Sequence, residues 1–147
     1  MLATSVAAIS ASAEAAGADS GRVLLGAVDG GGHVYVEVGE RAIDGTRVRV
    51  YKTRFRNVPL RCSDGSARTT NFGATELIRH HSKLRRKLSS GADGKGAASK
   101  YGWEYQGVLK RWGRAAGTLH AYEVDLATRR RVVCRSGSLA WSATLRP

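Results

Sequence analysis

The stretch RVRVYKTRFRNVPLRC, residues 47–62, holds the strongest β-strand signal of the chain and one of its two cysteines. Apolar and polar residues alternate along it, as is typical of a strand with one buried face. The apolar positions change phase twice, from Val48 and Val50 to Tyr51, Thr53 and Phe55, and then to Val58, Leu60 and Cys62. Each change predicts a bulge or a kink, and Pro59, which lacks an N–H, is expected at an edge or a bulge.

Alternating segments flank this stretch on both sides. Upstream, residues 23–28 and 33–38 are separated by the turn sequence DGGG, and IDG at 43–45 supplies a second turn. Downstream, alternation continues at 101–105, 132–134 and 139–145, and 115–124 follows RWGR as a return strand; turn or loop signals lie at RWGR, 125–129 and Ser136-Gly137. The pattern predicts consecutive hairpins of an antiparallel sheet.

The segment TELIRHHSKLRRKLSS, residues 75–90, fits two structures. Five residues fall at helical spacing, which would give an amphipathic helix: Leu77, Ile78, His81, Leu84 and Leu88. The same residues fit a hairpin that turns at His81-Ser82, with Leu84, Arg86 and Leu88 alternating. The composition of 89–99 predicts a flexible loop.

The chain length suits one domain, and the turn spacing of 8 to 12 residues is typical of all-β folds. We predict that residues 21–147 form a single antiparallel β-sandwich or barrel of about eight short strands, with a helix near 76–88 as the open alternative.

The first twenty residues differ from the rest, because they are rich in Ala and Ser and hold no basic side chain. Small residues in the patterns Ala11-Ser12-Ala13 and Ala16-Gly17-Ala18 resemble signal-peptidase sites. We interpret 1–20 as the remnant of a secretory signal, with a disordered arm as the alternative. A secreted or cell-envelope location would favour a disulfide between Cys62 and Cys134. No stretch reaches the length of a transmembrane span, which predicts a soluble domain.

The charge is strongly positive, with 24 Lys and Arg against 12 Asp and Glu. The first twenty residues hold two of the acids, so the remainder carries +14. A field of this size attracts polyanions such as nucleic acid, acidic polysaccharide, cell-wall phosphate polymers or an anionic membrane. A generic solubilising surface would carry the same charge.

Basic residues cluster on the predicted strands, and aromatic residues lie between some of them. A run of basic side chains extends from 47 to 61, and a second from 79 to 87. Tyr101, Trp103 and Tyr105 form an aromatic stripe that is more typical of a core than of an exposed platform. The candidates for a polyanion site are Arg47, Arg49, Arg54, Arg56, Arg79, Lys83, Arg85, Arg86, Lys87, Lys110, Arg111, Trp112 and Arg114.

Catalytic and cofactor motifs are not evident in the sequence. GADGKG lacks the spacing of a phosphate loop, and the four histidines lack the acidic or Cys partners of a zinc site. Most aspartates lie beside predicted turns, where they cap the backbone. We therefore expect no enzyme activity, no cofactor and no metal.

The runs FRNVPLRCSDGS, GRAAGTL and CRSGSLAWSA, in this order, resemble a large group of uncharacterised secreted proteins of actinobacteria. The resemblance covers about residues 23–145, implies one disulfide and a strand at 76–88, and implies no activity. We therefore expect a secreted or envelope β domain that binds an anionic polymer. The alternative is an envelope domain with a structural or protein-binding role, whose protein partner is unknown. A hydrolase is the weakest alternative.

Overall fold

The computed structural model describes residues 21–78, 83–90, 99–110, 113–126 and 131–146. Its regular elements are all β-strands, which confirms the predicted fold class. The nine strands of the described residues are β1 (Arg22–Val28), β2 (His33–Ile43), β3 (Thr46–Cys62), β4 (Ala67–Ile78), β5 (Lys83–Ser90), β6 (Ser99–Lys110), β7 (Arg114–Asp125), β8 (Val132–Arg135) and β9 (Leu139–Leu145). In this part of the chain no helix is long and apolar enough to span a lipid bilayer.

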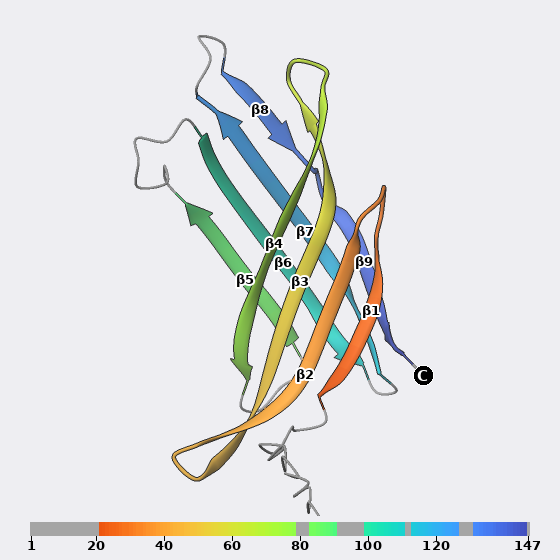
Figure 1. Cartoon of the computed structure of the whole chain (residues 1–147), viewed down its shortest axis with the longest axis vertical. Coiled ribbons are helices and arrows are strands. Elements are labelled where there is room, and N and C mark those ends of the chain that lie inside the picture. The colour runs from red at the N-terminus through yellow and green to blue at the C-terminus, as the bar shows by residue number, and fades with distance from the viewer. Residues whose placement is uncertain (1–20, 79–82, 91–98, 111–112, 127–130, 147) are drawn as a thin grey trace, which may run out of the picture.

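The strands form one antiparallel sheet that closes on itself. Its order is β4-β3-β2-β1-β9-β7-β6-β5, and the short strand β8 pairs with both β3 and β7. Six strands thus make a closed ring, β3-β2-β1-β9-β7-β8, with β4 added beside β3 and β6 and β5 added beside β7. In Figure 1, β1 to β4 form the front layer, and they cross the strands of the back layer at a steep angle.

An aromatic core joins the two layers. Phe55 of β3 lies 5.2 Å from Tyr105 and 5.6 Å from Trp141, measured between ring centroids. Phe72 of β4 stacks on Trp103 at 5.2 Å. The stripe of β6 is therefore mostly core, as the sequence favoured, because Trp103 and Tyr105 are buried and only Tyr101, 42 % exposed, is not.

The disulfide predicted between Cys62 and Cys134 is present, and it connects the layers at the upper end of the barrel. The two residues are direct partners in the β3–β8 ladder. A serine lies one or two residues after each cysteine and accepts a hydrogen bond from a neighbouring strand: Ser63 Oγ from the Val133 N–H at 3.0 Å, and Ser136 Oγ from the Ala121 N–H at 2.8 Å. These hydroxyls replace backbone acceptors where the ladders end.

The described parts of the segment 76–88 are strands, so the helical alternative is wrong for them. Residues up to Ile78 belong to β4, which pairs with β3, and residues from Lys83 belong to β5, which pairs with β6. The helical spacing of its leucines also fits an alternating strand, and the ladders offered by β3 and β6 decide the outcome. The predicted turn at His81-Ser82 and most of the loop predicted at 89–99 lie outside the described residues.

The second phase change in β3 is the predicted bulge. The β3–β4 register shifts between Phe55 and Val58, and Asn57 has a positive φ of 53°. The Asn57 N–H donates to Asn71 Oδ1 at 2.8 Å, which satisfies a donor that the bulge removes from the ladder. Pro59 follows directly, as expected for a residue without an N–H.

A bulge or a kink was predicted between Val50 and Tyr51, and the bulge is absent. The β2–β3 pairing continues without a shift from Ile43↔Thr46 to His33↔Arg56. Val48 and Tyr51 are both buried although they face opposite sides of the strand, and Val48 lies outside the main core cluster. Because β1 begins opposite Val38, the β2–β3 hairpin extends beyond the ring, and the side that is buried changes there without any break in the ladder.

Candidate functional site

The middle of β3 presents a row of cations on the outer face of the front layer. Lys52, Arg54 and Arg56 alternate with Thr53 and Phe55, which point into the core and are fully buried. The arginines are exposed and Lys52 is partly exposed. Alternate residues of a strand lie about 6.8 Å apart, so the three charges form an evenly spaced row.

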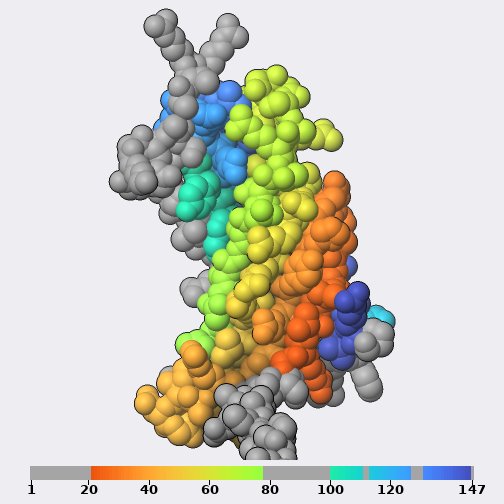
Figure 2. Space-filling view, in the orientation of Figure 1, coloured from red at the N-terminus to blue at the C-terminus, as the bar shows by residue number. Residues whose placement is uncertain are grey.

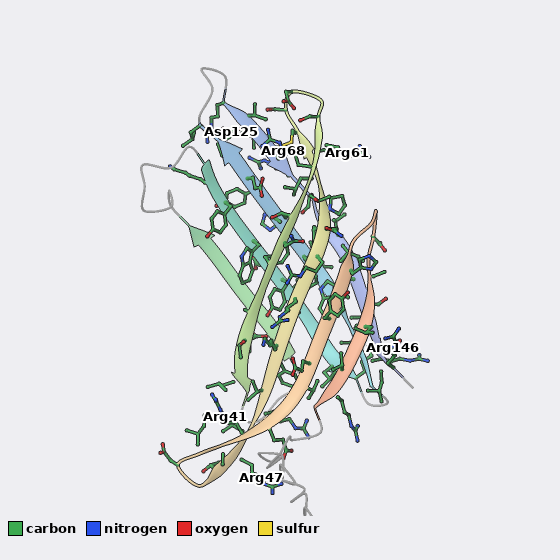
Figure 3. The ribbon with its side chains drawn as sticks, in the orientation of Figure 1. Arg41, Arg47, Arg61, Arg68, Asp125 and Arg146 are labelled. Carbon is green, nitrogen blue, oxygen red and sulfur yellow. A yellow bond between two sulfur atoms is a disulfide. The ribbon has the colours of Figure 1, made fainter. Side chains whose placement is uncertain are left out.

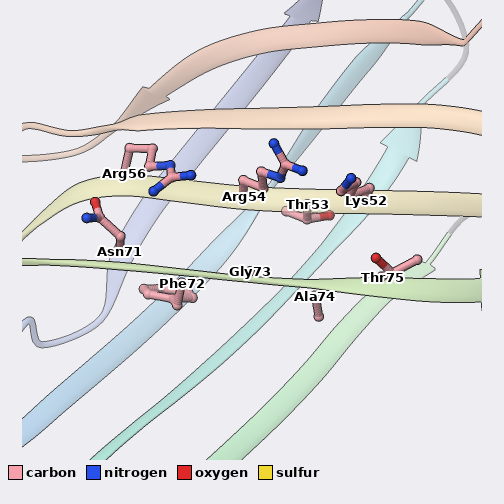
Figure 4. A pocket seen from close by; sticks show the side chains of 9 residues that line it. All are labelled: Lys52, Thr53, Arg54, Arg56, Asn71, Phe72, Gly73, Ala74 and Thr75. Carbon is pink, nitrogen blue, oxygen red and sulfur yellow. The ribbon is translucent and has the colours of Figure 1, made fainter.

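A shallow groove of about 310 Å³ lies between this row and β4. Figure 4 shows the cations along β3, with Asn71 and Thr75 across from them on β4. Gly73, the ladder partner of Arg54, leaves the middle of the groove open. A Cβ at Gly73 would meet the Thr53 carbonyl oxygen and would lie 3.3 Å from Arg54 Cγ. The groove is lined by Lys52, Thr53, Arg54, Arg56, Asn71, Phe72, Gly73, Ala74 and Thr75.

The charged residues that line this groove are all positive. Three of its lining residues are cationic, and none is an aspartate or glutamate. On the outer face, the register places a carboxylate beside one end of the row, because Glu37 of β2 is the ladder partner of Lys52. The groove therefore suits an anion best beside Arg54 and Arg56, away from Glu37.

Arg47 and Arg49 are separated from this row. They lie on the extended β2–β3 hairpin, and because the ladder is unbroken they occupy the face of β3 opposite to Arg54 and Arg56. A bulge at Val50 would have put all four arginines on one face. Arg47 also pairs with Glu40 at 3.4 Å, in an ion pair whose side chains are 85 % and 46 % exposed. Exposed pairs of this kind contribute little to stability.

The remaining basic candidates are distributed over other elements. Lys110 and Arg114 are ladder partners at the β6–β7 turn, in the back layer. Lys83, Arg85, Arg86 and Lys87 belong to β5, where the structure describes the backbone alone. Arg79, Arg111 and Trp112 lie outside the described residues. Only Arg54 and Arg56 are thus shown to line one groove.

A second ion pair lies at the opposite end of the molecule. Arg68 Nη2 lies 3.7 Å from Asp125 Oδ2, next to the β3–β4 turn, whereas Arg41 and Arg47 lie at the hairpin end (Figure 3). At this turn, hydrogen bonds from the Ser66 hydroxyl, at 2.6 Å, and the Ser66 N–H, at 2.9 Å, lower the pKa of the Asp64 carboxyl. These groups cap the turn and lie away from the groove.

A mixed polar groove of about 350 Å³ lies on the back layer. Glu104 and His120 are ladder partners on its floor, and Arg135 contributes the opposite charge. Gln106 Nε2 donates to Thr118 Oγ1 at 3.4 Å. In the part of the chain that the structure describes, no group of three or more His, Cys, Asp or Glu is placed to hold a metal ion.

Sequence reasoning found the cations of the groove but missed the residues opposite them. Asn71, Gly73 and Thr75 carry no charge, and only the β3–β4 register brings them to Arg54. Tyr35, 41 % exposed, is the ladder partner of Arg54 on β2 and was not among the predicted site residues. The signal available was the shared alternation of 33–38 and 51–56.

Comparison of the chain with models of protein families, with curated proteins and with solved structures finds no match. The resemblance to secreted actinobacterial proteins therefore stays a prediction.

Proposed function

We propose that this protein is a secreted or cell-envelope domain without enzyme activity, which binds an anionic polymer along the β3–β4 groove. The observation that carries the proposal is the composition of the groove. Three evenly spaced cations lie along one strand, the other lining residues are neutral, and no carboxylate lines the groove. A polymer with regularly repeated negative charges matches such a row better than a single small anion does.

The rest of the molecule supports this binding in two ways. The net charge of +12 raises the local concentration of polyanions around the whole surface. The groove then provides fixed contacts that a field alone does not. The Cys62–Cys134 disulfide fits an oxidising compartment, which supports the proposed location.

The test compares two double variants of equal charge. The full chain with oxidised cysteines is titrated with oligothymidylate, a sulfated polysaccharide, a cell-wall phosphate polymer and anionic vesicles at several salt concentrations. Arg54→Gln/Arg56→Gln removes two charges from the groove, and Arg47→Gln/Arg49→Gln removes two from the opposite face of the same strand. We expect the groove variant to lose affinity for at least one polymer and its salt dependence to become shallower, by about 1.4 in the log–log slope for a single strand.

Equal losses in the two variants would mean that binding depends on the overall field, and the proposal would be wrong. Loss confined to a third variant, Arg85→Gln/Arg86→Gln, would move the site to β5. Binding that does not weaken as salt rises would favour a protein partner instead, because contacts between uncharged surfaces are not screened.

A further inference from the structure

The outer face of the front layer continues the groove as an ordered set of columns, one per strand. Across the ladders, Arg54 has Gly73 on one side and Tyr35 on the other, and Tyr35 in turn pairs with Leu25 of β1. The next row along the strands contains Arg56, His33 and Ala27. Figure 2 shows this face, on which β4, β3, β2 and β1 lie side by side.

The chemistry changes in one direction across these columns. Neutral polar residues on β4 are followed by cations on β3, by the rings of His33 and Tyr35 on β2, and by the apolar residues Val23 and Leu25 on β1. Tyr35 and Val23 are each 41 % exposed. Neighbouring strands are about 4.8 Å apart, so Tyr35 and Arg54, as ladder partners, extend from adjacent positions on the same outer face.

From this order we infer that the polymer bound in the groove is a single-stranded nucleic acid. The inference rests on the proposed function and names its ligand. The sugar-phosphate backbone lies along Arg54 and Arg56, and unpaired bases extend across β2 and stack on Tyr35, with His33 beside the next base. A charged groove flanked by exposed rings is the arrangement by which proteins hold single strands without reading their sequence.

Other polyanions match this face less well. Sulfated polysaccharides and cell-wall phosphate polymers lack the flat unsaturated rings of bases, so Tyr35 would add less to their binding than it adds to that of a stacked base. In a duplex the bases are stacked and paired inside, where the flat face of β2 has no access to them. Glu37, the partner of Lys52, repels phosphate in the third row, which limits the best contacts to the two rows of Arg54 and Arg56.

The experiment removes the protein ring and the nucleic acid base separately and together, and compares the four binding affinities. The full chain and its Tyr35→Leu variant are titrated with a fluorescent oligothymidylate and with an abasic oligomer of the same length and charge. The Tyr35→Leu change should weaken oligothymidylate binding about tenfold and leave the abasic oligomer unaffected, because a stacked base and its ring contribute on this scale. The matched control is Tyr101→Leu, since Tyr101 is 42 % exposed but belongs to β6. It should change neither affinity.

The outcomes separate this inference from the proposed function. If Tyr35→Leu has no effect on oligothymidylate, or weakens both oligomers equally, the bases do not stack there and the inference is wrong, although loss in Arg54→Gln/Arg56→Gln would still support the groove. If Tyr35→Leu weakens binding to phosphatidylglycerol vesicles and not to oligothymidylate, the face is a membrane surface. If the groove variant loses nothing, the proposed function fails as well. Retention of cooperative thermal unfolding checks that each variant folds.

Discussion

Thr53 is a core residue whose buried hydroxyl lowers the stability of the fold. It lies between Lys52 and Arg54, points inward and is fully buried, and its hydroxyl has no hydrogen-bond partner. Tyr51 and Trp141 each bury one unpartnered polar atom as well. A buried hydroxyl without a partner costs roughly 1 to 3 kcal/mol relative to its exposure to water.

We expect Thr53→Val to stabilise the protein by about 1 kcal/mol, because valine has the shape of threonine and removes the unpartnered group. Equilibrium unfolding in urea measures the change in the free energy of unfolding. The control Thr69→Val replaces an exposed threonine of β4 and should change that free energy by less than about 0.5 kcal/mol. Destabilisation by Thr53→Val would show that the hydroxyl is satisfied in solution, for example by a buried water.

The turn at Asp64 predicts a pH dependence. Hydrogen bonds from the Ser66 hydroxyl and N–H hold the pKa of this carboxyl below its ordinary value in the folded protein. A lowered folded-state pKa means that the ionised turn stabilises the fold above the ordinary value for Asp, about 3.9, and that this contribution is lost as the pH falls toward the folded-state pKa.

Asp64→Ala should therefore be less stable than the wild type at pH 7, and the difference should shrink once the pH falls below about 4. Thermal unfolding of both proteins across this range measures the gap. A gap that stays constant down to the acid limit would show that Asp64 acts by packing or backbone preference and not through its charge.

At the scale of elements, the sequence predicted strands better than it predicted their faces. The alternation of 139–145 and the bulge before Val58 are both present in the structure. The first phase change in β3 was misread because a strand that leaves the ring also changes which side is buried, and alternation alone does not distinguish that from a bulge. This phase change also affects the predicted binding site, because a bulge there would place Arg47 and Arg54 on the same face.

The segment 76–88 shows the same limit in another form. Leu77, Leu84 and Leu88 satisfy both a helical and a strand pattern, and local sequence does not contain the ladders of β3 and β6 that select the strand. The groove could not be predicted for a related reason. The neutral residues of β4 lie opposite Arg54 only because the bulge at Asn57 shifts the β3–β4 register.

The disulfide links two elements that are 72 residues apart in sequence. The double variant Cys62→Ala/Cys134→Ala should lower the free energy of unfolding by about 4 kcal/mol, because it releases a long loop in the unfolded chain. Urea unfolding of the variant and of the oxidised wild type measures this loss. A loss below about 1 kcal/mol would mean that the β1–β9 ladder and the aromatic core already restrict the chain as much as the bridge does.

For the whole molecule, the closed ring brings the first and last strands together. Leu24 pairs with Leu145, and the Arg146 N–H donates to the Val23 carbonyl at 3.5 Å. Residues 21 and 146 therefore lie close enough for a short flexible linker to join them. The β2–β3 turn at Asp44-Gly45 lies at the far end of a hairpin that extends beyond the ring, where a break removes few contacts.

We expect a circular permutant that joins 146 to 21 and opens between Asp44 and Gly45 to fold with its disulfide and to unfold cooperatively, because every ladder of the ring is kept. The control permutant opens between Val36 and Glu37, inside β2, where the cut divides a strand that pairs with both β1 and β3. It should lose cooperative unfolding, as monitored by circular dichroism.

Since the β3–β4 groove is intact in the first permutant, its affinity for oligothymidylate should equal that of the parent. A folded permutant that no longer binds would mean that binding requires the continuous β2–β3 hairpin tip, and the site would then have to include Arg47 and Arg49.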